Sequence, residues 1–349
     1  MESTNNTRLD WADQTKALAI WFIVLGHCPQ QHTLVLDYIY IFHVAVFFFI
    51  SGFFERPISQ ASLRTRIIKS LKGLIIPYLC FNLFALSYCW VSPKLHPELY
   101  YNIHGVTIFR NALTGILLMD DCVTPYSFLP NGPLWFLISL FICKLLFFIF
   151  LKACQNKNLY IKLLQIIAFA ILLILIYKFD FHFASLDSTV LAFPIYLLGF
   201  YFKEKELHLQ FRNKGVAFMI LVFIVSIAML IIGKHFNGFS EYDSGSYGNS
   251  IILFYLESIS GILICICPML AINHKNNLIS LIGQNTLTIL GLHLSILLIG
   301  KFIYAYFLGL NITNLPIIYT LVLSIIAVLV CCPIAIFFKK YLPFLIGKS

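Results

Sequence analysis

Long apolar runs separated by short polar segments make up most of the chain. Runs of about 17–25 predominantly apolar residues are long enough to cross a bilayer as helices. Such runs lie at 12–29, 35–54, 71–91, 133–153, 160–177, 188–202, 214–233, 251–272, 282–302 and 315–338. Polar residues interrupt a further stretch at 103–119, which we expect to be interfacial or re-entrant unless it forms an eleventh span. The pattern therefore predicts an all-α polytopic membrane protein of about ten transmembrane helices.

Composition excludes an ordinary soluble domain. Hydrophobic residues make up 60% of the 349 residues, charged residues only 11%, and the mean hydropathy is +0.88. A soluble domain has roughly a quarter of its residues charged. The net charge of +9 would suggest nucleic acid in a soluble protein. Here the basic residues form short clusters between apolar runs, as in polytopic membrane proteins, so we expect no nucleic-acid partner.

Lys and Arg residues are divided unequally between alternate loops. Of the 24, 18 lie on one side of the ten predicted spans, Lys144 lies within a span, and the other side has Lys94, Arg110, Lys178, Lys234 and Lys301. Because cytoplasmic loops carry the basic excess, we expect both termini in the cytoplasm. An eleventh span would move the basic clusters at 152–162 and 203–214 outside, which argues against it.

The chain is predicted to be a single membrane-embedded domain covering residues 1–349. It has no internal repeat, no inverted symmetry between its halves and no low-complexity tail. Its ten cysteines are scattered, and the pair Cys265 and Cys267 lies on different helix faces. This spacing does not suit a metal site, so no metal is expected.

The first predicted span carries three ionisable residues near one face. Lys16 and His27 are eleven residues apart, which at 100° per residue returns them to nearly the same face, about 16 Å apart along the axis. Asp13 lies within about 40° of that face. Ionisable side chains in membrane helices usually face a partner or a wet cavity. The alternative is an interfacial Asp13–Lys16 ion pair and an ordinary interface position for His27.

Other polar residues gather at two depths. His43, Glu257 and His293 fall in the middle or outer half of their spans, whereas Arg64, Arg66, Lys69 and Lys72 lie near Lys16 on the cytoplasmic side. A basic mouth suits a polyanionic donor such as a nucleotide-containing cofactor. A deeper imidazole suits proton abstraction from an alcohol. The alternatives are a topology signal for the basic cluster and backbone hydrogen bonds for the histidines.

Several short motifs resemble, in order and over most of the chain, the membrane proteins of acyltransferase family 3, and most closely their fucose 4-O-acetylase-like branch. They are Asp13-x-x-Lys16, Gly26-His27, Phe42-His43-x-x-x-Phe47-Phe48-Phe49-Ile50-Ser51-Gly52, a basic segment leading to Pro77-Tyr78, Gly132-Pro133-Leu134-Trp135-Phe136-Leu137, and Gly283-x-Asn285-Thr286-x-x-Ile289-x-x-x-His293. Two positions depart from the family pattern. Lys16 replaces a frequent Arg, and Leu290 replaces a frequent Tyr.

The resemblance implies an O-acetyltransferase of a bacterial inner (plasma) membrane. It implies cytoplasmic acetyl-CoA as donor and an envelope polysaccharide, or its lipid-linked precursor, as acceptor. On this hypothesis His27 is the general base or a transient acyl carrier, and Asp13 orients Lys16. Lys16 would bind the CoA phosphates together with Arg66, Lys69 and Lys72. The expected acceptor-side residues are His43, Trp135, Glu257 and His293.

Three alternatives remain open at this point. A transporter or flippase could move a sugar or lipid-linked glycan without making bonds, although such folds often show inverted repeats and broken helices in matching positions. A family member could transfer another acyl group, such as succinyl. A non-catalytic scaffold would leave Lys16, His27, Glu257 and His293 without a reason to lie in lipid. Trp135 on its own is also an ordinary membrane-interface residue.

Overall fold

The computed structural model describes residues 9–28, 33–56, 63–95, 105–119, 129–154, 160, 161, 164, 167, 171, 175, 183–272, 274, 276–309 and 316–347. Within these ranges every regular element is helical, and one isolated antiparallel bridge joins Glu241 and Ser246. The predicted all-α class is therefore confirmed. Most of the predicted span at 160–177 lies outside the described residues.

The helices follow one another along the chain with short connections. The first half contains α1 (Asp10–Gly26), α2 (Thr33–Phe53), α3 (Leu63–Ser70), the π-helical turn η2 (Leu71–Ile75), α4 (Ile76–Leu95), α5 (Gly105–Leu118), the 3₁₀ turn η3 (Gly132–Leu134) and α6 (Trp135–Cys154). The second half contains η4 (Phe183–Ser185), α8 (Leu186–Glu204), α9 (Leu207–Asn213), α10 (Val216–Asn237), α11 (Ile251–Ala271), α12 (Asn277–Gly283), α13 (Thr286–Leu308), α14 (Ile317–Tyr341) and η5 (Pro343–Ile346).

Six helical stretches of the described chain are long and apolar enough to cross a membrane. They are Leu63–Ser87, Gly132–Lys152, Val216–Asn237, Ile251–Ala271, Thr286–Leu308 and Ile317–Tyr341. Their outer faces expose large aliphatic side chains, for example Ile220, Leu221 and Ile224 of α10. Apolar faces of this extent suit lipid rather than water. Together, these helices indicate an integral membrane protein.

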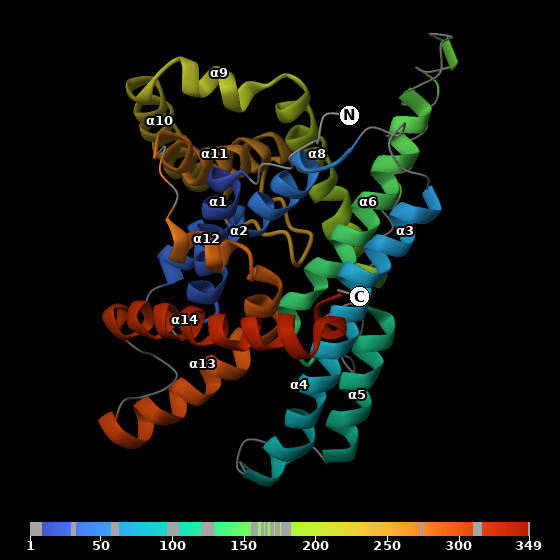
Figure 1. Cartoon of the computed structure of the whole chain (residues 1–349), viewed down its shortest axis with the longest axis vertical. Coiled ribbons are helices and arrows are strands. Elements are labelled where there is room, and N and C mark those ends of the chain that lie inside the picture. Colours follow the sequence, from blue (N-terminus) through green and yellow to red (C-terminus); the bar gives the residue numbers. More distant parts are fainter. Residues whose placement is uncertain are drawn as a thin grey trace.

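Helix α1 lies inside the bundle and is packed on several sides (Figure 1). Twelve of its 17 residues are buried, and it contacts α2, α11, α12, α13 and α14. Asp10 and Asp13 lie in its first turn, where carboxylates complement the partial positive charge of a helix N-terminus. The helix that carries the candidate chemistry is therefore enclosed by neighbouring helices.

Helices α2 and α8 approach each other closely through two glycines. A Cβ on Gly52 would overlap the carbonyl of Tyr196, and a Cβ on Gly199 would overlap the carbonyl of Phe49. Small residues permit such close contact between membrane helices. This packing holds the chain after α2, including Glu55, against α8.

The third helical segment starts earlier than the sequence predicts. We expect a span from residue 71, whereas the chain is helical from Leu63 through η2 into α4. Arg and Lys are good helix formers, and the basic cluster has exposed positions that need no apolar partner, so the helix extends through it. Within the stretch at 103–119, Gly105–Leu118 form α5, a 14-residue helix that packs along α4 (Figure 1). A helix of this length is shorter than the roughly 20 residues that a bilayer requires.

Candidate active site

A cavity of about 180 Å³ lies beside Lys16. We call it the Lys16 cavity. Among the described residues, its lining apart from Lys16, Ser51, Gly73 and Thr286 is apolar and consists of Ile20, Ile23, Phe47, Leu74, Phe136, Leu137, Leu140, Leu287 and Leu290. One cation therefore stands at a largely apolar space enclosed by α1, α2, η2, α6 and α13.

Asp13 and Lys16 form the ion pair that the sequence suggests. Their Oδ1 and Nζ atoms are 2.7 Å apart, and the side chain of Asp13 is 4% exposed whereas that of Lys16 is 21% exposed. Gln284 donates a hydrogen bond of 3.3 Å from Nε2 to Asp13 Oδ2. A Cβ on Gly283 would overlap the carbonyl oxygen of Asp13, so glycine at that position lets α12 pack directly on the start of α1. These contacts give the motif around Gly283 a physical role, which is to position Asp13 and through it Lys16.

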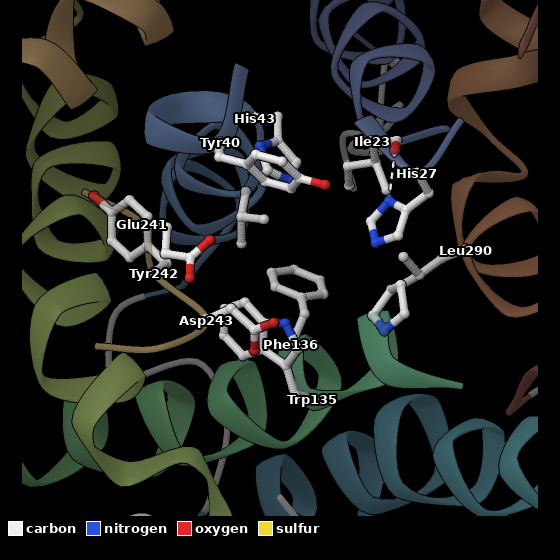
Figure 2. Close-up of a pocket in the computed structure, with 12 residues that line it drawn as sticks. Ile23, His27, Tyr40, His43, Trp135, Phe136, Glu241, Tyr242, Asp243 and Leu290 are labelled. Carbon is white, nitrogen blue, oxygen red and sulfur yellow. Dashed lines mark hydrogen bonds between the residues drawn. The ribbon is translucent and has the colours of Figure 1, made fainter. Parts of the chain in front are cut away.

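A second, smaller cavity of about 40 Å³ lies beside His27 (Figure 2). We call it the His27 cavity. Its walls are Ile23, His27, Tyr40, His43, Val44, Pro133, Trp135, Phe136, Glu241, Tyr242, Asp243 and Leu290. The structure thus brings together His27, His43 and Trp135, three residues that sequence analysis placed in the site.

The hydrogen bonds of His27 and His43 define which ring nitrogen faces the cavity. Nδ1 of His27 lies 2.8 Å from the carbonyl oxygen of Ile23, and Nδ1 of His43 lies 2.6 Å from that of Ile39. A carbonyl oxygen only accepts, so Nδ1 carries the proton in both rings and Nε2 has a free lone pair. Neither Nε2 makes a hydrogen bond to the described part of the chain. Both imidazoles are therefore arranged as proton acceptors.

The two cavities adjoin along α1. Ile23, Phe136 and Leu290 line both of them. Lys16 lines only the larger cavity, and His27 lines only the smaller one. The three shared apolar side chains therefore form the boundary between a space with a cation and a space with an imidazole.

The start of α6 is held in place by buried amide groups. Asn131 donates a 2.7 Å hydrogen bond from Nδ2 to the carbonyl of Gly291, and its backbone N–H donates to Oδ1 of Asn82 at 3.2 Å. Pro133 follows in the turn η3, where a missing N–H costs nothing. These contacts tie α4, α6 and α13 together and fix Trp135 and Phe136 at the cavity walls.

Sequence analysis missed the residues between α10 and α11. Glu241, Tyr242 and Asp243 line the His27 cavity, and Figure 2 shows the two carboxylates pointing into it from the side away from His27. Tyr40 was also missed, and its hydroxyl donates a 2.9 Å hydrogen bond to the carbonyl of Gly26. The sequence does contain one signal for this loop, which is a pair of acidic residues on either side of an aromatic residue in a chain with few charges.

Glu257 and His293 line neither cavity. The Oε2 atom of Glu257 accepts hydrogen bonds from Asn237 at 3.1 Å and from Ser240 at 3.4 Å, so this carboxylate ties α11 to the end of α10. His293 is fully buried, and its ring centroid lies 5.1 Å from that of His27. Its Nδ1 donates toward the carbonyl of Leu290 at 2.9 Å. His293 therefore packs directly against His27 without reaching the cavity wall.

The basic residues expected at the donor side have different environments. Arg66 donates a 2.9 Å hydrogen bond from NH1 to Glu55 Oε2. Lys69 and Lys72 are exposed and make no ion pair within the described residues. Lys72 immediately precedes Gly73, which lines the Lys16 cavity. The π-helical turn that contains both is of a kind often found at functional sites.

Glu55 is the centre of a charged cluster that sequence analysis missed. Lys144 and Tyr196 each approach its Oε1 atom at 2.8 Å, and Arg66 binds its Oε2 atom. Burial opposes ionisation of Glu55, but Lys144 and the hydrogen bonds from Lys144, Tyr196 and the Arg56 amide outweigh it, so the pKa of Glu55 lies below its ordinary value. This cluster joins α3, α6 and α8 to the end of α2.

Comparison with known families supports a chemical interpretation of this arrangement. Residues 9–336 match the family model described as an acyltransferase domain, that of acyltransferase family 3. Neither the curated proteins nor the solved structures gave a match.

Proposed function

Because the chain belongs to acyltransferase family 3, which makes it a membrane acyltransferase, we propose that it is an O-acetyltransferase that moves an acetyl group from cytoplasmic acetyl-CoA to a sugar hydroxyl of an envelope polysaccharide. The acceptor would be the polysaccharide or its lipid-linked precursor. Within the family, the order of the sequence motifs taken together favours the fucose 4-O-acetylase-like branch.

One observation carries this proposal. The Lys16 and His27 cavities adjoin across Ile23, Phe136 and Leu290. Acyl transfer from a polyanionic donor to an alcohol is assisted by a cation that binds the donor phosphates and by a proton acceptor beside the alcohol. The two cavities supply both groups in that order, with apolar walls between them.

In the proposed reaction, the Nε2 lone pair of His27 removes the proton from an acceptor hydroxyl. The alcohol oxygen attacks the thioester carbonyl carbon, and the resulting tetrahedral intermediate breaks its carbon–sulfur bond. The CoA sulfur then takes the proton back from Nε2. The hydrogen bond from Nδ1 to the carbonyl of Ile23 holds the ring in the tautomer that this sequence of steps requires. The ring of His293 packs against the His27 ring in an edge contact, with the centroids 5.1 Å apart.

The cations around the Lys16 cavity would bind the donor. Lys16 would contact a CoA phosphate, with Asp13 holding its ammonium in place. Lys72 in the π-helical turn and Lys69 near the end of α3 would contact the other phosphates. Arg66 could join them only by giving up part of its ion pair with Glu55. The apolar walls of the cavity suit the uncharged pantetheine arm.

The remaining expectations belong to the same proposal. Ten transmembrane helices with both termini in the cytoplasm would explain the unequal distribution of Lys and Arg. A bacterial inner membrane would give one face access to cytoplasmic acetyl-CoA and the other access to the envelope glycan. With this sidedness the Lys16 cavity would face the cytoplasm.

A deletion strain tests the proposed function. The surface glycan is isolated from the deletion strain and from strains that carry the wild-type gene or the His27→Ala variant, and its amount and O-acetyl content are measured. We expect an unchanged amount of glycan without acetyl groups in the deletion and His27→Ala strains. Loss of the glycan itself from the surface, with acetylated material retained inside the cell, would instead indicate a transporter.

A further inference from the structure

The residues that follow α14 fold back onto the start of α4. Helix α14 ends at Tyr341, and the turn η5 comes after it and packs against both α14 and α4. In Figure 1 the red end of the ribbon accordingly lies beside α4. Ile346 is buried, so the turn is fixed to the bundle. Residues 339–347, which we call the 339–347 segment, lie beyond the part of the chain that matches the family model.

Gly347 contacts the π-helical turn directly. A Cβ on Gly347 would overlap the carbonyl oxygen of Lys72 and the Cα atom of Gly73, so only a hydrogen fits between these two stretches of backbone. The φ angle of Gly347 is +69°, which glycine adopts without strain. Glycine at this position therefore provides both the backbone conformation and the close contact with the turn.

The helical hydrogen-bond pattern is interrupted where Gly347 packs. Pro77 has no N–H and cannot donate to the carbonyl of Gly73 four residues earlier or to that of Lys72 five residues earlier. The N–H of Ile76 donates five residues back, in the π-helical pattern, and so does not serve Lys72. The shape of this turn therefore depends on its tertiary contacts, and Gly347 supplies one of them.

The same turn shapes the Lys16 cavity. Gly73 and Leu74 line that cavity, and Lys72 immediately precedes them. In the proposed function Lys72 binds a CoA phosphate. A shift of the turn would therefore move a cavity wall and a phosphate-binding cation together.

A second contact joins the 339–347 segment to the other side of the donor site. The ammonium of Lys339 donates a 3.3 Å hydrogen bond to the carbonyl of Gln284. Gln284 donates in turn to Asp13, which holds Lys16 in an ion pair. The start of the segment is thus linked to Lys16, and its end packs on the turn that contains Lys72.

We propose that the 339–347 segment positions the donor site by holding Lys16 and Lys72 at the spacing that the CoA phosphates require. The inference rests on the proposed acetyl transfer and adds to it residues that line neither cavity. Gly347 acts through the backbone of Lys72, and Lys339 acts through Gln284. An ammonium is a compact point charge, so its distance from a phosphate decides how strongly it binds.

The first test compares two glycines with a positive φ angle. Gly347→Ala introduces the overlap with the turn. Gly309→Ala is the matched control, because φ is +59° there and no atom lies within 4 Å of an added Cβ. The full-length variants are assayed in proteoliposomes with acetyl-CoA or with S-acetylpantetheine, a thioester without phosphate. The acceptor is unacetylated surface glycan from a deletion strain, and thermal unfolding checks that each variant is folded.

Gly347→Ala should raise the KM for acetyl-CoA about fivefold or more and leave kcat within about twofold, because phosphate contacts bind the donor before and during transfer alike. The KM for S-acetylpantetheine should stay within about twofold, and Gly309→Ala should match the wild type with both donors. A wild-type KM for acetyl-CoA in Gly347→Ala, or an equal increase with both donors, would overturn the inference. An equal increase in Gly309→Ala would do the same.

The second test removes the contact with Gln284 and applies even where Gly347→Ala does not fold. Lys339→Met should raise the KM for acetyl-CoA about threefold, and Lys339→Arg, which keeps a donor, should restore it. Lys340→Met is the control, since this neighbouring exposed ammonium lies over the ring of Tyr341 instead. A wild-type KM in Lys339→Met, or the same increase in Lys340→Met, would contradict the positioning role.

Hydrogen exchange gives a measurement that does not depend on catalysis. Amides of η2 and the start of α4 should exchange faster in Gly347→Ala than in the wild type or Gly309→Ala, because the turn loses a tertiary contact. Unchanged exchange in Gly347→Ala would overturn the inference. Failure of the proposed function gives a different result, since the wild type itself would then transfer no acetyl group from acetyl-CoA.

Discussion

Removing the charge of Lys16 tests whether the larger cavity binds the donor through its phosphates. Lys16→Met removes the ammonium and keeps most of the side-chain length, whereas Lys16→Arg keeps the charge. The ammonium is 2.7 Å from the nearly buried carboxylate of Asp13, and the Lys16 side chain as a whole is 21% exposed. A hydrogen bond to a charged group contributes about 1.5–3 kcal/mol, and partial exposure places Lys16 at the lower end.

This contribution corresponds to an increase of roughly 10- to 30-fold in KM for acetyl-CoA in Lys16→Met, because each 1.4 kcal/mol is about tenfold. Lys16→Arg should stay within about threefold, since an Arg keeps the charge even where its geometry differs. The assay follows acetyl transfer in proteoliposomes with two donors, acetyl-CoA and S-acetylpantetheine, which has no phosphate. The effect of Lys16→Met should disappear with S-acetylpantetheine.

The comparison of donors separates phosphate binding from a structural effect. A Lys16→Met variant that loses the same factor with both donors would refute the phosphate contact, because S-acetylpantetheine has nothing for the ammonium to bind. Equal losses in Lys16→Met and Lys16→Arg would also contradict a role based on charge.

Three further substitutions test the charged cluster around Glu55, the packing of Gly283 against Asp13, and the boundary between the two cavities. Glu55→Gln should lower the free energy of unfolding by about 2–3 kcal/mol at pH 7, because it leaves the partly exposed Lys144 without its anion. Because the folded pKa of Glu55 is lowered, this difference should be present above the ordinary carboxyl pKa and lost as the pH falls through the folded pKa. Gly283→Ala should cost about 1–3 kcal/mol by displacing Asp13 and should raise the KM for acetyl-CoA. Leu290→Ala should widen the boundary between the cavities and raise the rate with butyryl-CoA relative to acetyl-CoA at least fivefold.

Each of these results has a defined contrary outcome. Denaturant unfolding of Glu55→Gln that matches the wild type at pH 7 would exclude a stabilising cluster. Gly73→Ala is the control for Gly283→Ala in the unfolding measurement, since no atom lies within 4 Å of a Cβ added there. Equal stability of the two alanine variants would contradict the packing argument. An unchanged butyryl-to-acetyl rate ratio in Leu290→Ala would show that acyl groups do not pass this boundary.

Helix periodicity was sufficient to predict that Lys16 and His27 lie along one side of the first predicted helix. Eleven residues make close to three turns, which predicts Lys16 and His27 on nearly one face of the first span. In the structure Lys16 lies in α1, His27 follows its last residue, and each lines one of two adjoining cavities. Long apolar runs likewise predicted the helical class. Both are local properties of the chain, so neither required knowledge of the neighbouring helices.

The rotation of each helix about its own axis and the placement of the loops could not be predicted in the same way. The depth of Glu257 along α11 is clear from sequence, but its direction depends on where α10 packs, and it binds Asn237 instead of facing His27. Glu241 and Asp243 reach the cavity through long-range contacts of their loop with α8 and α11. The periodicity of a sequence does not indicate long-range contacts of this kind.

The most direct test of the account is single-turnover acetyl transfer by His27→Ala in proteoliposomes. The donor is acetyl-CoA, and the acceptor is the unacetylated surface glycan isolated from a deletion strain. A positioned general base contributes about 10²–10⁴-fold, so we predict a loss of at least 100-fold in the rate of transfer with little change in the affinity for acetyl-CoA. A rate close to that of the wild type would contradict the assignment of His27 as the general base.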